Sequence, residues 1–515
     1  MRDVINHLTG AGTPARLPSP EDAARLAGLL SGRLGMQVRP RSITGTAAGI
    51  LFLGYHEGSK RLGAVRVDAS PSLEGAEQAL EVDGVRLRAR MTPADARSAD
   101  WLRRALPHLA ARPLGLARSA GFGDRLGLAT PGHVRSVRKF RMAAIFAQQS
   151  VRENERAGRS PREVLDDAMW GVFEEGWTAD WGADADHLKT VAHAEAFAAA
   201  GYSFFTVDPG EHVGNAAAAA APAALERVLS DLPWAELETT RSDLERGLCG
   251  RPLDLGALQV RLAPEAVLRA AAKYGRAVAH TLRLHRRLLQ VMAGRGFDFE
   301  MSVDETDSPT SLAEHIYIAS ELRRLKVSCV SLAPRYTGTF EKGVDFIGDL
   351  AAFEASFAGH AAVARAYGPY KLSLHSGSDK FSVYPIASRL AGELVHLKTA
   401  GTSYLEALRS LAAIAPSLFR AILTFAVERY PTDRASYHVS AEAGLIPNAA
   451  GMRDGELPGL LEDFHAREVL HVTFGSVIND PRFRAPFFDA LRRHAEVYTR
   501  TVEAHFDRHL RLFGE

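Results

Sequence analysis

The densest group of chemically capable side chains in this sequence lies in the string KLSLHSGSDKFSVYP, at residues 371–385. If the first part of the string is a β-strand, alternation sends its two leucines to one face and Lys371 and His375 to the other. Asp379 and Lys380 follow after a flexible Ser-Gly-Ser turn. In a barrel of parallel strands the leucines would pack beneath helices and the polar side chains would line the interior. Because a charged group inside a barrel needs an oppositely charged partner or a functional role, the string predicts one wall of an active site.

Two other strings place acids and an imidazole where strands are expected to end. WGADADHLKT brings Asp186, His187 and Lys189 close together in sequence. An acid beside an imidazole can supply a general base and a metal ligand, although an aspartate before a helix is also a common helix cap. In FDFEMSVDET, Glu300 falls on the polar face of the expected strand. It is either a functional acid or the partner of a buried barrel lysine such as Lys371.

The loops and strands further along the chain carry more charge. In SLAPRYTGTFEKG, the planar guanidinium of Arg335 matches the shape of a carboxylate, which favours an anionic substrate. Glu341 in the same loop is either a functional residue or surface charge, because it adjoins a lysine. In ELVHLKTAGTS, His396 and Lys398 fall on one face of the expected strand.

Short strand-like runs that alternate with amphipathic helical segments must position these side chains. Eight such runs with helical crossovers are what a (β/α)8 barrel requires, so the sequence predicts an α/β fold of the TIM-barrel type. The rival is an open, doubly wound sheet, but GFGDRLG at residues 121–127 lacks the spacing of a phosphate-binding glycine loop. The eight runs are SAGFGDRLGL, MAAIFAQQS, GWTADWGA, YSFFTVDP, FDFEMSVDE, KVSCVSLAP, YKLSLHSG and ELVHLKTAG.

The pattern changes at about residue 115. Residues 1–115 contain a helical stretch and short alternating runs, and EVDGVRLRAR is typical of a hairpin with Asp83 and Gly84 at its turn, which predicts a small N-terminal α+β cap. Residues 116–515 form the predicted catalytic barrel, with a helical insertion at about 211–295 and a C-terminal helical extension. Two later runs, SYHVSAE and VLHVTFGSV, also have the pattern of strands.

The composition argues against several classes of partner. Lys and Arg number 62 and Asp and Glu number 61, so the formal net charge of +1 provides no overall field for nucleic acid or an anionic membrane. The two cysteines exclude a disulfide framework and suit a reducing compartment. The first twenty residues have no apolar core of the signal-peptide type, and no apolar run approaches a membrane-spanning length. We expect a cytoplasmic protein with neither nucleic acid nor membrane as a partner.

Five strings occur here in an order and form similar to those of a known family. GADADHLKT, FDFEMSVDETDSP, SLAPRYTGTFEKGVD, KLSLHSGSDKFSVYP and HLKTAGTSYLEALR together resemble the tagaturonate epimerase family, whose members interconvert tagaturonate and fructuronate. The resemblance covers roughly residues 116–480, and the alanine-rich stretch 216–223 departs from it. It implies a metal-dependent barrel that acts on a keto-uronate, or on a ketohexose as some members do.

The implied reaction limits the possible chemistry. The two keto-uronates differ at a carbinol carbon one bond beyond the carbon α to the ketone, so the carbonyl does not acidify the hydrogen there. A transient oxidation would need a nicotinamide, and the sequence shows no dinucleotide fingerprint. A retro-aldol step followed by an aldol step, through a metal-bound enediolate, fits better.

Spacing and resemblance together predict the roles of ten residues. A divalent cation of manganese, nickel, cobalt or zinc would be held by His187, His375 and Glu341, with Glu305 or His438 as substitutes for Glu341. Asp186 would be the base and Glu300 the opposite acid. The candidates for holding the carboxylate and hydroxyls of the substrate are Lys189, Arg335, Lys371, Asp379 and Lys398.

Two alternatives remain open on sequence grounds. A metal-dependent sugar aldolase or ketose–aldose isomerase on the same scaffold would display the same groups. A sugar-acid-binding protein without turnover is the alternative from outside catalysis, although binding alone rarely needs two acids beside two imidazoles.

Overall fold

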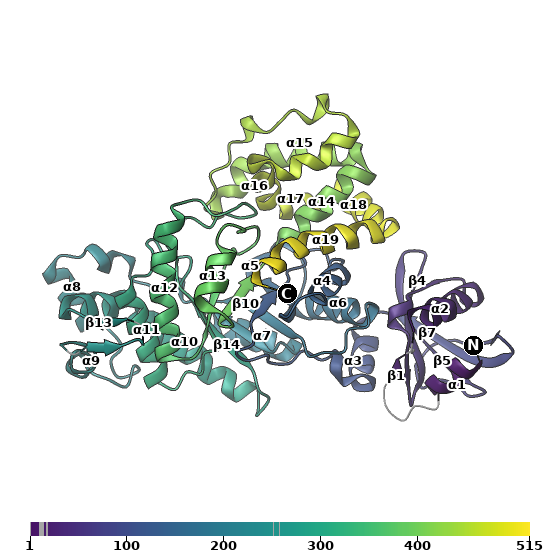
Figure 1. The fold of residues 1–515 in the computed structure, drawn as a ribbon, viewed down its shortest axis with the longest axis horizontal. Helices are drawn as coiled ribbons and strands as arrows, with labels where there is room; N and C mark the ends of the chain where they lie inside the picture. Colours follow the sequence, from purple (N-terminus) through teal and green to yellow (C-terminus); the bar gives the residue numbers. More distant parts are fainter. Residues whose placement is uncertain (1, 10–14, 17–18, 251, 257, 515) are drawn as a thin grey trace.

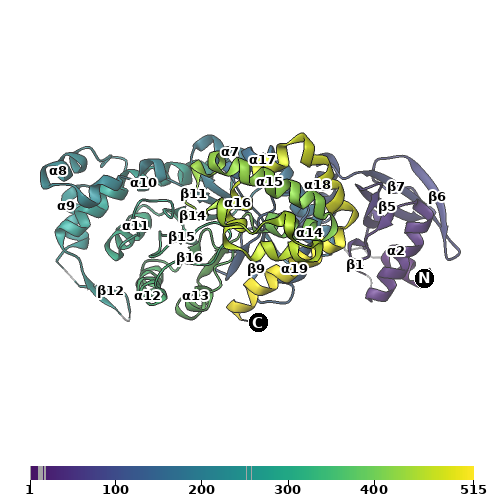
Figure 2. The same cartoon turned by 90° about the horizontal axis from the view of Figure 1, so that it is seen from above.

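The computed structural model describes residues 2–9, 15–16, 19–250, 252–256 and 258–514. Its long axis runs from the N-terminal sheet at one end to a helical region at the other, with a barrel between them (Figures 1 and 2). Among the described residues, no helix combines the length and the apolar character needed to cross a bilayer.

The N-terminal part is a twisted antiparallel sheet covered by helices, which confirms the predicted α+β cap. The sheet has the order β1-β3-β4-β5-β7-β6, and β2 pairs with β4. The hairpin turn at Asp83 and Gly84 is confirmed, because both residues have positive φ values (51° and 74°) between the paired Val82 and Val85. The elements are α1 (Arg2–Thr9), β1 (Ala15–Arg16), α2 (Pro20–Leu34), β2 (Gln37–Val38), β3 (Thr44–Thr46), β4 (Gly49–His56), β5 (Ser59–Val67), β6 (Glu77–Val82), β7 (Val85–Pro93) and α3 (Ala96–Ala105).

The centre of the molecule is a closed barrel of eight parallel strands, which confirms the predicted fold class. The strands are β8 (Ser119–Gly121), β9 (Ala143–Ser150), β10 (Gly182–Leu188), β11 (Phe204–Val207), β14 (Asp298–Ser302), β15 (Ser331–Ala333), β16 (Lys371–Leu374) and β17 (Val395–Lys398). The third predicted run, GWTADWGA, began too early, since the strand itself is GADADHL. This shift matters because it places Asp184 and Asp186 within a strand rather than after one.

Helices between the strands cover the outside of the barrel. Several begin with a capping box, as at Ser160 and Glu163 or at Ser311 and Glu314, where side chains satisfy the first free N–H groups of the helix. The crossover helices are α4 (Thr130–Val137), α5 (Val151–Ala157), α6 (Pro161–Glu174), α7 (Val191–Ala200), α11 (Leu312–Arg324), α12 (Leu350–Tyr367), α13 (Tyr384–Ala391) and α14 (Thr402–Ile414).

The helical insertion lies between β11 and β14. It contains α8 (Pro222–Ser230), α9 (Arg241–Leu248) and the long α10 (Pro264–Val291). It also contains a small hairpin, β12 (Pro252–Asp254) paired with β13 (Gln259–Arg261), which the sequence pattern did not predict.

A C-terminal helical layer lies against one end of the barrel, at the top of Figure 1. It consists of α15 (Pro416–Asp433), α16 (Phe464–Val472), α17 (Phe474–Asn479), α18 (Pro481–Arg493) and α19 (Ala495–Leu510). The two additional strands predicted here were wrong. SYHVSAE lies in an irregular segment after a short 3-10 turn, and VLHVTFGSV belongs to α16 and α17. Val469 and Val472 are buried in α16 and Phe474 is buried in α17, so packing outweighed their preference for strands.

Candidate active site

One buried ammonium group joins three carboxylates inside the barrel. Lys398 at the end of β17 places Nζ 2.8 Å from Asp184 Oδ2, 2.9 Å from Asp186 Oδ1 and 2.9 Å from Glu300 Oε1. These side chains meet because alternate residues of each strand point into the barrel, so β10, β14 and β17 direct their polar side chains to a common interior. Burial alone would lower the pKa of Lys398, but the three carboxylates raise it above its ordinary value. Lys398 is therefore charged and balances part of the acidic cluster.

Asp186 is the acid of this cluster that faces the cavity. Its Oδ2 accepts a hydrogen bond of 2.8 Å from Nε2 of Gln148 on β9. Burial raises the pKa of the Asp186 carboxyl, but Lys398, His187 and His375 outweigh it and hold the pKa well below the ordinary value. The Asp186 carboxylate is therefore ionised and able to accept a proton.

His375 stands immediately after β16, between two acids. Its Nε2 lies 2.7 Å from Glu300 Oε1, and its Nδ1 lies 3.3 Å from Asp304 Oδ1. Burial lowers the pKa of His375, but Asp304 and Glu300 together raise it to about 9. The pKa of Glu300 lies well below its ordinary value, because Lys398 and His375 outweigh the effect of burial.

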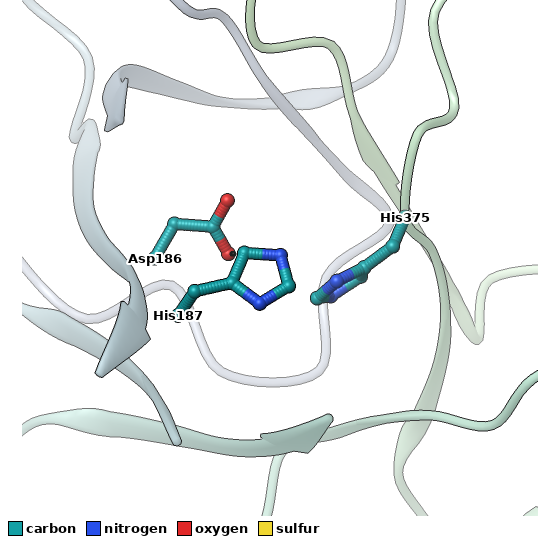
Figure 3. A group of neighbouring side chains, drawn as sticks. All are labelled: Asp186, His187 and His375. Atoms are coloured by element: carbon teal, nitrogen blue, oxygen red, sulfur yellow. Dashed lines mark ion pairs between the residues drawn. The ribbon is translucent and has the colours of Figure 1, made fainter. Parts of the chain in front are cut away.

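His187 reaches the same space through a break in strand alternation. Regular alternation would send Asp186 inward and His187 outward. The pairing of β10 with β11 shifts between Ala185 and Leu188, however, and His187 has a φ of 54°. This bulge turns the imidazole toward the barrel mouth, so that Asp186, His187 and His375 point toward a common space (Figure 3).

A carboxylate behind His187 fixes the orientation of its ring. His187 Nδ1 lies 3.2 Å from Asp208 Oδ2, while Nε2 faces Asp186 Oδ1 at 4.0 Å. The rings of His187 and His375 are 5.1 Å apart and nearly perpendicular. Burial lowers the pKa of His187, but Asp186 and Asp208 raise it to about 10. Both imidazoles are therefore protonated at neutral pH, because several carboxylates surround them.

The cluster opens into two neighbouring cavities. An inner cavity of about 30 Å³ is lined by Asp186, His187 and Lys398, among others. An outer cavity of about 130 Å³ is lined by Asp304, Arg335 and His438, among others. Both are also lined by Arg152, Lys342, His375, Ser376 and Tyr437. The shared residues make the two cavities parts of one candidate site at the carboxyl ends of the strands.

The donor atoms at this site fit a divalent cation. Among the described residues, the ligand atoms of Asp186, His187 and His375 lie within 4.8 Å of one another. Mixed imidazole and carboxylate ligands suit first-row transition metals. No residue that the structure describes donates a hydrogen bond to the buried Glu300 Oε2, and both imidazoles have raised pKa values, so a cation would relieve a local excess of negative charge.

A second group of potential ligands, Asp379, His505 and His509, lies apart from the cavities. His509 Nε2 accepts a hydrogen bond from the backbone N–H of Asp379, and its Nδ1 is 3.0 Å from the carbonyl oxygen of His505. Asp379 itself is paired with Arg467 at 2.8 Å and accepts a hydrogen bond from Thr402 Oγ1. This group therefore fastens α19 to the loop that follows His375.

The structure brings some of the predicted site residues together and leaves others apart. Asp186, His187, Glu300, His375 and Lys398 converge, and Arg335 lines the outer cavity. Of the substitute ligands, His438 lines the outer cavity, and Glu305 pairs with Arg152 at 3.2 Å at the same cavity.

Four predicted site residues have other surroundings. Glu341 Oε2 accepts hydrogen bonds from Ser440 and does not join the two imidazoles. Asp379 is buried in the cluster beside α19. Lys371 donates to the Ala117 carbonyl and to Ser119 Oγ, near the start of β8 and thus toward the opposite end of the barrel. Lys189 lines a third cavity, which shares Arg152 and His187 with the inner cavity, and its Nζ lies 3.6 Å from Glu211 Oε1.

Several cavity residues were not predicted from the sequence, among them Gln148, Lys342 and Tyr437. Gln148 could have been predicted, because it is a polar side chain near the end of a strand that is apolar before it. Lys342 drew attention only as the neighbour of Glu341. Tyr437 offered no signal, because its segment has the pattern of a strand and reaches the cavity from the C-terminal helical layer.

Comparisons with known proteins agree with this geometry. A family model described as tagaturonate epimerase matches residues 39–513. A tagaturonate/fructuronate epimerase of Thermotoga maritima is 42% identical over 411 residues, which cover 80% of this chain and 84% of that protein. A glycerol-bound crystal structure of the fructuronate-tagaturonate epimerase from Cohnella laeviribosi superposes with a TM-score of 0.86 at 34% identity, over 96% of this chain and 100% of that chain. An uncomplexed crystal structure of the same enzyme gives the same TM-score at 35% identity, over 96% of this chain and 99% of that chain. The chain therefore belongs to the tagaturonate epimerase family.

Proposed function

We propose that this protein is a divalent-metal-dependent epimerase that interconverts D-tagaturonate and D-fructuronate. The names of its relatives support the substrate pair. The observation that carries the chemistry is the pair of ionised acids Asp186 and Glu300, which stand on different strands and share the ammonium of Lys398. Epimerisation through a cleaved intermediate needs proton carriers on two faces of the substrate, and this pair meets that requirement.

His187 and His375 are the proposed ligands of the cation. Their rings adjoin the inner cavity, and Asp208 leaves Nε2 of His187 available for coordination. A divalent cation held there would polarise the ketone of the substrate and stabilise the negative charge that develops on its oxygen. Because Glu341 is bonded to Ser440, we leave it out of the ligand set.

The protein side chains would move the protons. Asp186 takes the proton from the hydroxyl of the carbon that is to invert, and the bond from that carbon to the carbon α to the ketone breaks. The bonding electrons pass to the ketone, which becomes an enediolate, and the hydroxyl carbon becomes an aldehyde. The aldehyde rotates and the same bond re-forms on the other face. Because Glu300 is ionised at rest, the proton that it delivers to the new alkoxide is the one taken by Asp186, relayed through the ammonium of Lys398, which contacts both acids. Lys398 contacts both acids, so its charge is balanced whichever of them holds the proton.

The remaining polar residues have separate proposed roles. Arg335 is a partner for the substrate carboxylate, since it lines the outer cavity. Asp379 holds the loop after His375 through Arg467 and Thr402 instead of binding sugar hydroxyls. We assign Lys371 and Lys189 no contact with the substrate.

Product analysis tests the proposal. The purified protein is stripped with a chelator, reloaded with Mn²⁺, Ni²⁺, Co²⁺ or Zn²⁺, and incubated with D-tagaturonate. We expect fructuronate without released fragments in at least one reloaded sample, and loss of activity in the stripped sample. An accumulating aldehyde would identify an aldolase, an aldose product would identify an isomerase of another type, and binding without turnover would identify a sugar-acid-binding protein.

A further inference from the structure

Three basic side chains border the outer cavity, and they differ in how their charge is balanced. Arg152 is paired with Glu305 at 3.2 Å. Within the described part of the chain, neither Arg335 nor Lys342 has a carboxylate within 4.0 Å of its charged nitrogens. A cation at the wall of a partly enclosed cavity, without an acidic partner, is suited to binding an anion.

Lys342 has the more informative position of these two cations, and Glu153, the acid whose pKa it helps to lower, is itself directly paired with Arg125 at 2.7 Å. It lines the outer cavity with Arg335 and also lines the inner cavity with Asp186, His187 and Lys398. A group bound by Lys342 can therefore belong to a molecule whose other end reaches the two imidazoles. Arg335 lines only the outer of these two cavities.

A neighbouring hydroxyl fixes the ammonium of Lys342. Its Nζ donates a hydrogen bond of 2.6 Å to Ser376 Oγ, and Ser376 directly follows His375. The backbone of Ser376 has a φ of 47°, which holds this residue in a turn beside the imidazole. An ammonium has three protons to donate, so two remain for a ligand. Because Ser376 directly follows His375, this hydrogen bond fixes the distance between the Lys342 ammonium and the His375 imidazole.

The substrates of the proposed reaction carry one suitable anionic group. A six-carbon keto-uronate has a ketone near one end and a carboxylate at the other, whereas the corresponding ketohexose has a neutral hydroxymethyl group in place of the carboxylate. We propose that Lys342, assisted by Arg335, binds the terminal carboxylate and is the residue that selects a keto-uronate over a ketohexose. This inference rests on the proposed function and adds to it the residue that determines substrate class.

Removing the charge should affect acidic ligands alone. Hydrogen bonds to charged groups are stronger than neutral ones, so Lys342→Met should weaken binding of a hexonate such as D-galactonate by about tenfold to a hundredfold. Galactitol has the same carbon chain without a carboxylate. Its binding should change by less than about twofold, because it has no carboxylate for Lys342 to bind. The Met side chain retains most of the apolar stem, and Lys342→Arg retains the charge and should recover most of the hexonate affinity.

Calorimetric titration of the Mn²⁺-loaded protein with the two ligands provides the test. Lys139→Met is the matched control, because it removes a lysine from a surface ion pair with Glu503 and Asp507. We expect the control to bind both ligands as the wild type does, and all variants to retain Mn²⁺ binding and cooperative unfolding. In turnover assays, Lys342→Met should raise KM for tagaturonate more than it lowers kcat.

Two results would overturn the proposal. In one, Lys342→Met weakens binding of the hexonate and the hexitol equally. In the other, it leaves the hexonate preference intact while Arg335→Met abolishes it. The binding measurement needs no turnover, so absence of epimerase activity would reject the proposed function and leave the assignment of Lys342 to be decided by the titrations.

Discussion

Replacement of Lys398 by Met removes the ammonium that three buried carboxylates share. In the wild type its Nζ lies 2.8 to 2.9 Å from oxygens of Asp184, Asp186 and Glu300, and its side chain is 3% exposed. The variant can restore the lost positive charge by taking up one proton on this acidic cluster. Protonating a carboxyl of ordinary pKa at pH 7 costs about 1.4 kcal/mol for each of roughly three pH units, or about 4 kcal/mol. This agrees with the cost of about 3 to 5 kcal/mol for breaking a buried ion pair.

The sign of the pH dependence follows from this proton uptake. Between pH 5 and pH 7 the folded variant would hold one proton more than its unfolded chain, so its stability falls as the pH rises. The deficit relative to wild type should therefore be about 4 kcal/mol at pH 7 and about 1.4 kcal/mol at pH 5. Urea unfolding of the metal-free proteins at pH 5, 6 and 7 measures it.

Lys371→Met is the matched control for this experiment. Lys371 is also a buried barrel lysine, but its Nζ donates to the Ala117 carbonyl and to Ser119 Oγ, which are neutral. Burial lowers its pKa to about 8, although Asp298, Glu300 and Asp184 raise it, so Lys371 stays protonated between pH 5 and pH 7. Because no carboxylate of the described residues contacts its Nζ directly, the control deficit should change with pH much less than the deficit of Lys398→Met. A pH-independent deficit for Lys398→Met, or a deficit below about 1 kcal/mol at pH 7, would refute the charge-balance argument.

Four further predictions concern the proton and metal chemistry. Asp186→Asn should lower kcat by at least about two to three orders of magnitude with Mn²⁺ affinity retained; titration calorimetry that finds the metal lost would make Asp186 a ligand, and near-wild-type turnover would reject it as the base. Because the pKa values of His187 and His375 are about 10 and about 9 without metal, cation binding at pH 7 should release about two protons. Calorimetry in buffers of different ionisation enthalpy counts these protons, and a count near zero would exclude the pair as ligands. The protonated imidazoles stabilise the metal-free protein fully below the unfolded histidine pKa of about 6.5, and this stabilisation is lost as the pH rises through 9 to 10. The Tm of the metal-free protein should therefore fall over that range. A constant Tm would contradict the raised pKa values of the two histidines. Asp208→Asn should weaken metal binding by about tenfold to a hundredfold, because Asp208 orients His187, and unchanged affinity would remove it from that role.

Much of the barrel and part of the site follow from local sequence patterns. Apolar runs of strand length separated by helical segments predict the eight strands, and alternation along them predicts that Glu300 and Lys398 face inward. The convergence of such residues at one end of the barrel is a property of parallel strands. These features depend on residues close together in sequence, which is why they are predictable.

The remaining features depend on contacts distant in sequence or on local breaks in regularity. His187 faces the site because of a bulge and a positive φ, which no alternation rule anticipates. Asp379 pairs with Arg467, and its backbone N–H donates to His509 of α19; both partners are far along the chain. Tyr437 reaches the cavities from a segment with the sequence pattern of a strand. In each case tertiary packing decided which polar residue faces the cavity.

In the proposed mechanism, the carbon–carbon bond next to the inverting carbon breaks and re-forms while the hydrogen on that carbon stays in place. Proton and carbon NMR of the metal-loaded protein incubated with D-tagaturonate in D₂O tests it directly. We predict a mixture of tagaturonate and fructuronate in which the inverting carbon retains its protium and no free aldehyde accumulates. Deuterium at that carbon, or the absence of fructuronate with every metal tried, would contradict the proposed mechanism.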